Sequence, residues 1–158
     1  MKNILITGSF SVGKSTTLEE IEKKIPQKER IITKDLARHY LQKNNLDSNT
    51  MSNKQREKLQ LTVSSGYIGS IIESSRAKMM AVMDGSLIEA YAYSQDVLSP
   101  LVLQAISKKL EGYKDHSIAY VLPPTIHLEN DGLRHNDKEF RVEIHKRIMQ
   151  SIQEHGIP

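Results

Sequence analysis

The stretch that most constrains the fold is ILITGSFSVGKSTTLEEI, residues 4–21. Apolar residues lead into Gly8, and Gly13, Lys14 and Ser15 then follow at the spacing G-x-x-x-x-G-K-[ST], ahead of an amphipathic segment. Glycines at these places let the backbone curl so that its N–H groups point at phosphate oxygens, and a helix N-terminus adds its positive end. We therefore predict a phosphate-binding loop between a buried strand and a helix.

This Walker A pattern assigns a role to each residue type in the loop. Lys14 is expected to reach the β and γ phosphates of ATP, and the Ser15 hydroxyl is expected to ligate Mg²⁺. The residues predicted to bind ATP are Gly8, Ser9, Ser11, Val12, Gly13, Lys14, Ser15 and Thr16. A plain strand-to-helix turn is the structural alternative. The loop does not name the reaction, but a GTPase is disfavoured because the sequence has no N-K-x-D or D-x-x-G motif.

Strand-like and helix-like segments alternate along the rest of the chain. Strands are expected at residues 3–8, 30–35, 79–85 and 117–123. A capping box of Ser52 and Gln55 predicts a long helix to about Arg76, and Ser99 with Pro100 predicts another to about Glu111. This alternation predicts an α/β fold with a doubly wound parallel sheet.

The last third of the chain is strongly charged. Asn136 is expected to cap a final helix, in which Phe140, Ile144, Ile148 and Ile152 form an apolar stripe. With no internal repeat or linker, residues 1–158 are expected to form a single domain.

Composition limits where the protein acts and on what. The chain of 158 residues has no cysteine, no signal-peptide pattern and no apolar run of the ~18 residues that a membrane span needs. We therefore expect a cytoplasmic protein without a membrane partner. The net charge of +3 comes from 22 basic and 19 acidic residues that are scattered, so charge alone supports a nucleic-acid partner only weakly.

Two aspartates follow predicted strands, at the sheet edge where ligands bind in such folds. Asp84 ends the apolar run MMAVMD, which has the form of a Walker B segment, and is expected to hold Mg²⁺. Asp35 ends the second strand and is expected to accept a proton from a substrate hydroxyl. For both residues the structural alternative is a helix N-cap.

Phosphoryl transfer also needs positive charge at the γ phosphate, which a mobile lid often supplies. Arg134 lies in the turn NDGLRHND, and Arg141 shares a helix face with Lys138 and His145. We predict that both arginines act in catalysis, the alternative being a solvated helix face. The alternate spacing of His127, Glu129 and Asp131 is explained equally well by a polar turn, so we predict no metal site there.

Four segments in order, GSFSVGKSTTLEEI, ITKDLARHYLQ, MDGSLIEAYAYS and residues 120–158, resemble the AAA-type P-loop kinases grouped with the nicotinamide riboside kinase domain of the bacterial NAD regulator. The resemblance implies that Asp35 and Arg38 match a substrate-binding E-x-x-R-like element. It also implies that Arg134 and Arg141 belong to a helical lid at about residues 124–145.

The sequence departs from that family at two places. The family has D-R-S after the third strand, where this chain has Asp84, Gly85 and Ser86, so the role of the missing arginine is expected to have moved to Arg38 or the lid. The family also continues into a fifth strand and an adenine-enclosing loop. We therefore expect a domain without that edge strand, which means either a truncated chain or an open base pocket.

Together these features predict an ATP- and Mg²⁺-dependent kinase of a nucleoside, a nucleotide or a related small metabolite. One alternative is a partner-dependent ATPase or switch associated with nucleic acid. Another is a kinase that acts on a modified base or an end within nucleic acid. The acceptor pocket is expected to draw on Arg38, Tyr40, residues 44–54 and residues 91–93.

Overall fold

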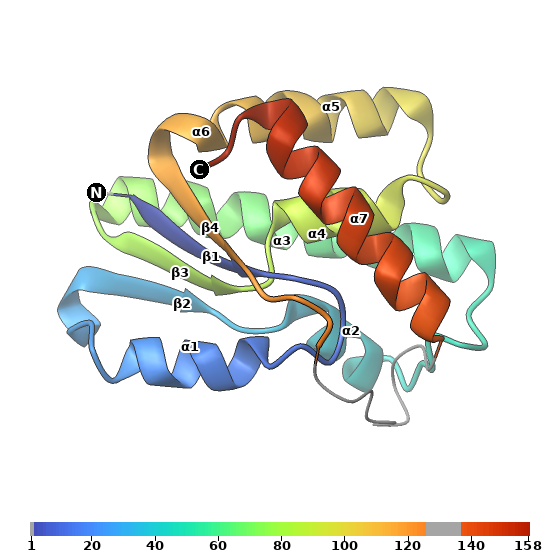
Figure 1. Ribbon diagram of the computed structural model, residues 1–158, viewed down its shortest axis with the longest axis horizontal. Coiled ribbons are helices and arrows are strands. Elements are labelled where there is room, and N and C mark those ends of the chain that lie inside the picture. Colours follow the sequence, from blue (N-terminus) through green and yellow to red (C-terminus); the bar gives the residue numbers. More distant parts are fainter. Residues whose placement is uncertain (1, 126–136) are drawn as a thin grey trace.

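A four-stranded parallel sheet in the order β2-β3-β1-β4 forms the centre of the protein, whose computed structural model describes residues 2–125 and 137–158 (Figure 1). The strands are β1 (Asn3–Thr7), β2 (Arg30–Thr33), β3 (Met80–Asp84) and β4 (Ser117–Val121). The helices are α1 (Lys14–Glu22), α2 (Leu36–Lys43), α3 (Asn53–Ala77), α4 (Leu87–Ser94), α5 (Pro100–Glu111), α6 (Tyr113–His116) and α7 (Lys138–His155), with a short 3₁₀ helix η1 (Gln27–Glu29). The predicted doubly wound α/β class is confirmed.

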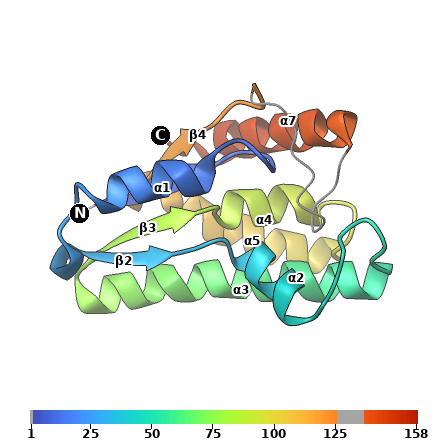
Figure 2. The same cartoon turned by 90° about the horizontal axis from the view of Figure 1, so that it is seen from below.

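Helices cover both faces of the sheet. Ile6 and Val82 point to one face, where they pack with Leu18 of α1. Leu5 and Met83 point to the other face, into a larger core built with α3, α4, α5 and α7. Figure 2 shows α1 on one side of the strands and α3 on the other. Burial on both faces explains why β1 and β3 are nearly continuous apolar runs rather than alternating ones.

Helix boundaries follow the local capping chemistry of the sequence. The Ser52–Gln55 capping box is present, with the Ser52 N–H donating to Gln55 Oε1 over 2.8 Å and the Gln55 N–H donating to Ser52 Oγ over 3.3 Å. Ser99 is the N-cap of α5, and Pro100 is its first residue. These predicted starts are confirmed.

Helix α7 begins one residue later than Asn136 would set it. Its N-cap is Asp137, whose Oδ1 accepts from the N–H groups of Glu139 and Phe140 over 2.8 and 3.1 Å. The prediction of Asn136 as the cap is therefore wrong, because the carboxylate next to it satisfies the first N–H groups of the helix. The stripe is confirmed, since Ile144 and Ile148 are fully buried.

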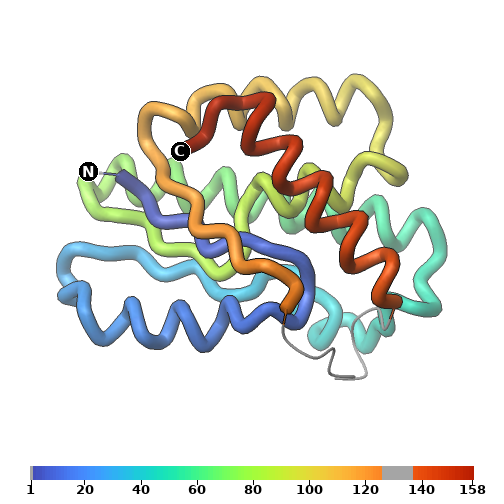
Figure 3. Tube along the Cα trace, in the orientation of Figure 1, coloured from blue at the N-terminus to red at the C-terminus, as the bar shows by residue number. Residues whose placement is uncertain are grey.

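The carboxyl ends of β1, β3 and β4 meet at one edge. The Gly85 N–H donates to the carbonyl oxygen of Ile6 over 2.8 Å, and the Leu122 N–H donates to that of Thr7 over 2.8 Å. Figure 3 shows the turn after β1 lying beside the end of β4. In the middle of β4, the Ala119 N–H donates to the carbonyl oxygen of Pro158 over 2.7 Å. The single-domain prediction and the missing fifth strand stay predictions.

Candidate active site

The phosphate loop, residues 8–15, is shaped by two glycines. Gly8 has φ +152°, and a Cβ there would lie 2.7 Å from the Leu122 carbonyl oxygen, so a larger residue would collide with the chain after β4. Gly13 has φ +85° and is the N-cap of α1, a left-handed conformation that suits glycine. Ser11 also has a positive φ, of 55°. The backbone therefore curls as the motif predicts.

Lys14 is buried and held by the loop itself. Its Nζ donates to the carbonyl oxygens of Gly8 and Ser9 over 3.0 and 2.8 Å, and it lies 3.6 Å from Glu89 Oε2. An ammonium group in this position faces the space that the loop encloses, where phosphate oxygens would bring the opposite charge. The plain-turn alternative does not explain why a lysine is buried at the start of α1.

Ser15 and Asp84 form the pair expected to hold Mg²⁺. The Ser15 hydroxyl donates to Asp84 Oδ2 over 2.5 Å, and Asp84 is only 2% exposed. Its second oxygen, Oδ1, is buried and has no hydrogen-bond partner within the described residues. One hydroxyl and one carboxylate with a vacant oxygen fit the hard oxygen ligands of Mg²⁺. Asp84 is not a helix cap, because the N-cap of α4 is Ser86.

Asp35, in contrast, is the N-cap of α2. Its Oδ1 accepts from the Arg38 N–H over 3.0 Å, and Oδ2 lies 3.9 Å from Arg38 Nε. Asp35 is therefore a helix cap, as the structural alternative predicted. The cap does not exclude a further role, because Asp35 also lines two hollows in the surface. Arg38 lines one of these hollows, of about 210 Å³, together with Ser15 and Asp84.

Glu89, on α4, is a charged residue of the site that the sequence patterns missed. It is 9% exposed and its Oε1 accepts from the Gly8 N–H over 3.0 Å. Burial raises the pKa of Glu89 to about 7 and Asp84 acts in the same direction, while Lys14 and hydrogen bonds from Thr7 and Gly8 act against it. The available signal was a lone acid in the apolar run LIEAYAY.

The surroundings of Gly85 explain why this chain has no arginine at the position after Asp84. Its φ is +85°, and a Cβ there would lie 2.2 Å from the Tyr67 hydroxyl oxygen. Tyr67 is buried and donates to the Asp84 carbonyl oxygen over 3.1 Å. Any side chain at position 85 would have to displace this tyrosine.

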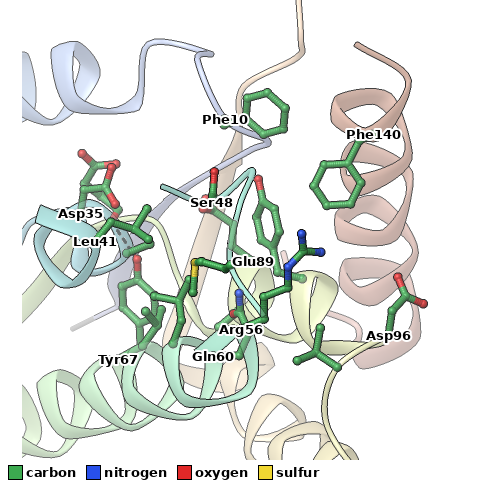
Figure 4. Close-up of a pocket in the computed structure, with 18 of the residues that line it drawn as sticks. Phe10, Asp35, Leu41, Ser48, Arg56, Gln60, Tyr67, Glu89, Asp96 and Phe140 are labelled. Atoms are coloured by element: carbon green, nitrogen blue, oxygen red, sulfur yellow. Dashed lines mark hydrogen bonds between the residues drawn. The ribbon is translucent and has the colours of Figure 1, made fainter. Parts of the chain in front are cut away.

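A second hollow, the acceptor pocket, opens beside Lys14 with a cavity volume of about 160 Å³. Its wall is largely apolar, and Phe10, Tyr93 and Phe140 gather in it as aromatic neighbours, with ring centroids 6.3 Å apart for Phe10–Phe140 and 6.1 Å for Tyr93–Phe140 (Figure 4). Ser48 and Met51 contribute from the predicted loop. Of the residues expected in this pocket, Arg38 lies in the other hollow, and the ring of Tyr91 contacts His155 instead.

Arg141 reaches the phosphate loop from α7. It is 5% exposed, and its Nη2 donates to the Ser11 carbonyl oxygen over 2.7 Å. Burial lowers the pKa of Arg141, although a guanidinium stays charged at neutral pH. A solvated helix face therefore does not describe this residue.

Part of the predicted lid lies outside the described residues. This applies to Arg134 and to the polar turn with His127, Glu129 and Asp131. Across residues 2–125 and 137–158, no group of three or more His, Cys, Asp or Glu side chains is placed to hold a metal ion. No helix among these residues has the length and apolar character that crossing a membrane requires.

Comparison with protein families gives one match. A profile of a family described as AAA domain matches residues 3–158. No curated protein matches the chain significantly.

Solved structures with the same arrangement include two of the NadR protein. The one in complex with NR has a TM-score of 0.68 and 20% identity, over 99% of this chain and 43% of that chain. The one in complex with NAD and AMP-PNP has a TM-score of 0.65 and 18% identity, over 98% and 42%. This chain therefore spans less than half of the NadR chains it matches.

The thymidylate kinase of Ehrlichia chaffeensis is also similar, with a TM-score of 0.63 and 11% identity over 98% of this chain and 82% of that chain. At such identities the likeness shows the fold, which is that of P-loop NTPases of the nucleoside-kinase type. The resemblance expected from the sequence is confirmed at this level.

Proposed function

Because the chain belongs to the AAA domain family and has a P-loop kinase fold, we propose that it transfers the γ-phosphoryl group of ATP to a hydroxyl group in the acceptor pocket. The acceptor is a nucleoside, a nucleotide or a related small metabolite. The observation that carries this proposal is that Asp35 and Asp84 line both hollows. A hydroxyl in one hollow and a phosphate in the other would meet at these two carboxylates.

The donor side follows from the loop. Lys14 and the N–H groups of residues 8–16 bind the phosphates, and Ser15 with Asp84 would hold Mg²⁺. Bound there, Mg²⁺ would offset the negative charge that develops on the phosphate oxygens. Arg141, fixed at Ser11, adds a guanidinium on the same side of the loop.

The acceptor side follows from the carboxylates. Asp35 is held in place by the Arg38 N–H, and its carboxylate takes the proton of the attacking hydroxyl. Glu89 contacts Lys14 and Gly8, and it keeps the lysine at the boundary between loop and pocket. The apolar wall excludes water, which would otherwise compete as the acceptor.

Transfer from labelled ATP to a pooled set of nucleosides and nucleotides tests the proposal. Asp84→Asn should raise the Mg²⁺ concentration needed for half-maximal rate, and Asp35→Asn should lower turnover with little change in ATP affinity. Asp115→Asn, an exposed residue of α6, is the matched control and should behave like wild type.

The alternatives predict other results. ATP hydrolysis that DNA or RNA stimulates, with no transfer to any small acceptor, would favour a partner-dependent ATPase. Transfer to an oligonucleotide alone would favour a kinase of nucleic-acid ends. The largely apolar pocket beside Lys14 is the reason for preferring a small acceptor.

A further inference from the structure

The acceptor pocket contains one cationic side chain that the phosphate loop does not use. Arg56, in the first turns of α3, lines the pocket and forms no ion pair with any described residue. Its Nε is buried and has no hydrogen-bond partner in the described part of the chain. Leaving a buried guanidinium N–H without a partner is costly, so a ligand that supplies one would bind favourably.

The carboxylates of the pocket wall do not meet this need. Asp84 bonds to Ser15, Glu89 to Gly8, and Asp96 to Arg147 over 2.6 Å. Each acid is thus engaged by another residue. In Figure 4 the Arg56 side chain rises from α3 into the pocket on the side of Phe140, and Asp35 lies on the opposite side.

Two neutral polar groups accompany Arg56. Gln60, one helical turn further along α3, lines the same pocket, and so does Ser48, whose buried Oγ has no hydrogen-bond partner within the described residues. The side chains around them are apolar, among them Met51 and Leu59. A phosphate dianion is normally bound by several cations and N–H groups. One guanidinium with an amide and a hydroxyl instead matches the hydrogen-bonding edge of a planar, neutral ring.

The geometry points to Arg56, Gln60 and Ser48 as the specificity subsite of the acceptor pocket, which binds the oxo–imide edge of a planar heterocycle of the kind in uracil, thymine and hypoxanthine. Arg56 donates to the exocyclic carbonyl oxygen, and the Gln60 amide oxygen accepts from the ring N–H. The aromatic cluster of Phe10, Tyr93 and Phe140 covers the ring. This inference rests on the proposed function, since it places the reacting hydroxyl at Asp35.

Matched pairs of nucleosides test the subsite by equilibrium binding, which needs no turnover. Uridine is compared with cytidine, and inosine with adenosine, by calorimetry on protein saturated with Mg²⁺ and a non-hydrolysable ATP analogue. In each pair the second member has an amino group and an unprotonated ring nitrogen in place of the carbonyl and N–H. Wild type should bind the oxo member of at least one pair about tenfold or more tightly than its partner.

Substitutions assign that preference to Arg56. Arg56→Met keeps the length of the side chain without its N–H groups and should reduce the ratio to within about threefold, while Arg56→Lys should restore only part of it. Lys54→Met, an exposed position in the same turn of α3, should leave the ratio unchanged. The ATP affinity of all three variants should equal that of wild type, because none lies in the phosphate loop.

Four results would overturn the inference: no preference in either pair, binding of none of the four nucleosides, a full ratio in Arg56→Met, or a ratio lost in Lys54→Met. An Arg56-dependent preference for uridine 5′-monophosphate over uridine, without an oxo–amino preference, would also overturn it by assigning the subsite to an anion. Failure of the proposed function is separate, because it appears as absent phosphoryl transfer in a protein whose nucleoside binding can still be measured.

Discussion

The phosphate site, made of the loop with Asp84 and Arg141, and the acceptor pocket share Lys14 and Asp84 but differ in how their cations are held. In the phosphate site, Lys14 and Ser15 of the loop and Arg141 of α7 bond to other groups of the protein. In the pocket, Arg56 Nε and Ser48 Oγ are buried without a partner among the described residues. The lysine of the phosphate site is therefore prepared by protein contacts before a ligand arrives, whereas the cation of the pocket wall, Arg56, is completed by its ligand.

Removing the lysine should have the largest effect on the prepared side. Lys14→Ala should abolish transfer and weaken ATP binding roughly a hundredfold, as expected from loss of ~2–5 kcal/mol when one partner of a buried charge pair is truncated. Titration calorimetry with ATP measures this, with exposed Lys23→Ala as the control. Unchanged ATP affinity would show that the loop is not the phosphate site.

Arg141 tests whether the loop contact from α7 acts in the reaction. Arg141→Ala should lower kcat by roughly 10² or more with a much smaller change in ATP affinity, because such an arginine acts mainly on the transition state. Arg141→Lys should recover part of the rate, since lysine lacks the planar fork. Lys138→Ala, which changes an exposed residue of the same helix, is the control and should keep a normal rate. A normal rate in Arg141→Ala as well would mean that the contact between Arg141 and Ser11 is only structural.

Gly85 tests how rigid the wall between loop and pocket is. Gly85→Ala should lower the free energy of unfolding by roughly 2–4 kcal/mol, since the new Cβ meets the Tyr67 hydroxyl at a φ of +85°. Gly69→Ala, where a Cβ meets nothing within 4 Å on α3, should instead raise it by about 0.5–1 kcal/mol. Urea unfolding of both variants measures the contrast. A smaller loss for Gly85→Ala in a Tyr67→Phe background would locate the clash at the hydroxyl.

Glu89 should give the smallest effect, seen as a pH dependence of stability. Its pKa of about 7 lies above the value of 4.5 expected in the unfolded chain, so the folded state binds more protons between these pH values. The stabilisation that protonated Glu89 contributes is fully present below about pH 4.5 and is lost as the pH rises through about 7. The loss between pH 5 and pH 8 is roughly 2 kcal/mol.

Glu89→Gln has no such titration, so its unfolding free energy should decline less over that interval. Urea unfolding of both proteins at pH 5 and pH 8 measures the difference. Equal declines of the unfolding free energy in the two proteins would mean that Glu89 has an ordinary pKa. Glu89 would then be charged over the whole interval where it contacts Lys14 and Gly8.

Local chemistry decided what could be predicted. The phosphate loop, the capping box at Ser52 and the position of Asp84 depend on residues close in sequence, so motif and spacing were enough. Helix α4 could not be recognised from hydrophobic periodicity, because it is buried among α3, α5 and α7 and has no polar face. Glu89 lies within that helix, so its contacts with Gly8 and Lys14 depend on tertiary packing.

The pocket could be predicted only in part for the same reason. Ser48 and Met51 come from the expected loop, but Arg56, Gln60 and Phe140 enter from two helices whose relative placement no short motif encodes. Arg38 follows Asp35 by three residues, and the turn of α2 carries it into the other hollow. Sequence spacing predicted which residues lie near the sheet edge, and packing decided which hollow each one lines.

The contact between Tyr67 and position 85 also restricts how this protein can change in evolution. A residue with a side chain at 85 can be accepted only after the space taken by the tyrosine has been released. The two positions should therefore vary together, with small residues at 67 wherever 85 is large. An arginine acquired at 85 while Tyr67 is retained would be selected against through lost stability before any gain in phosphate binding could act.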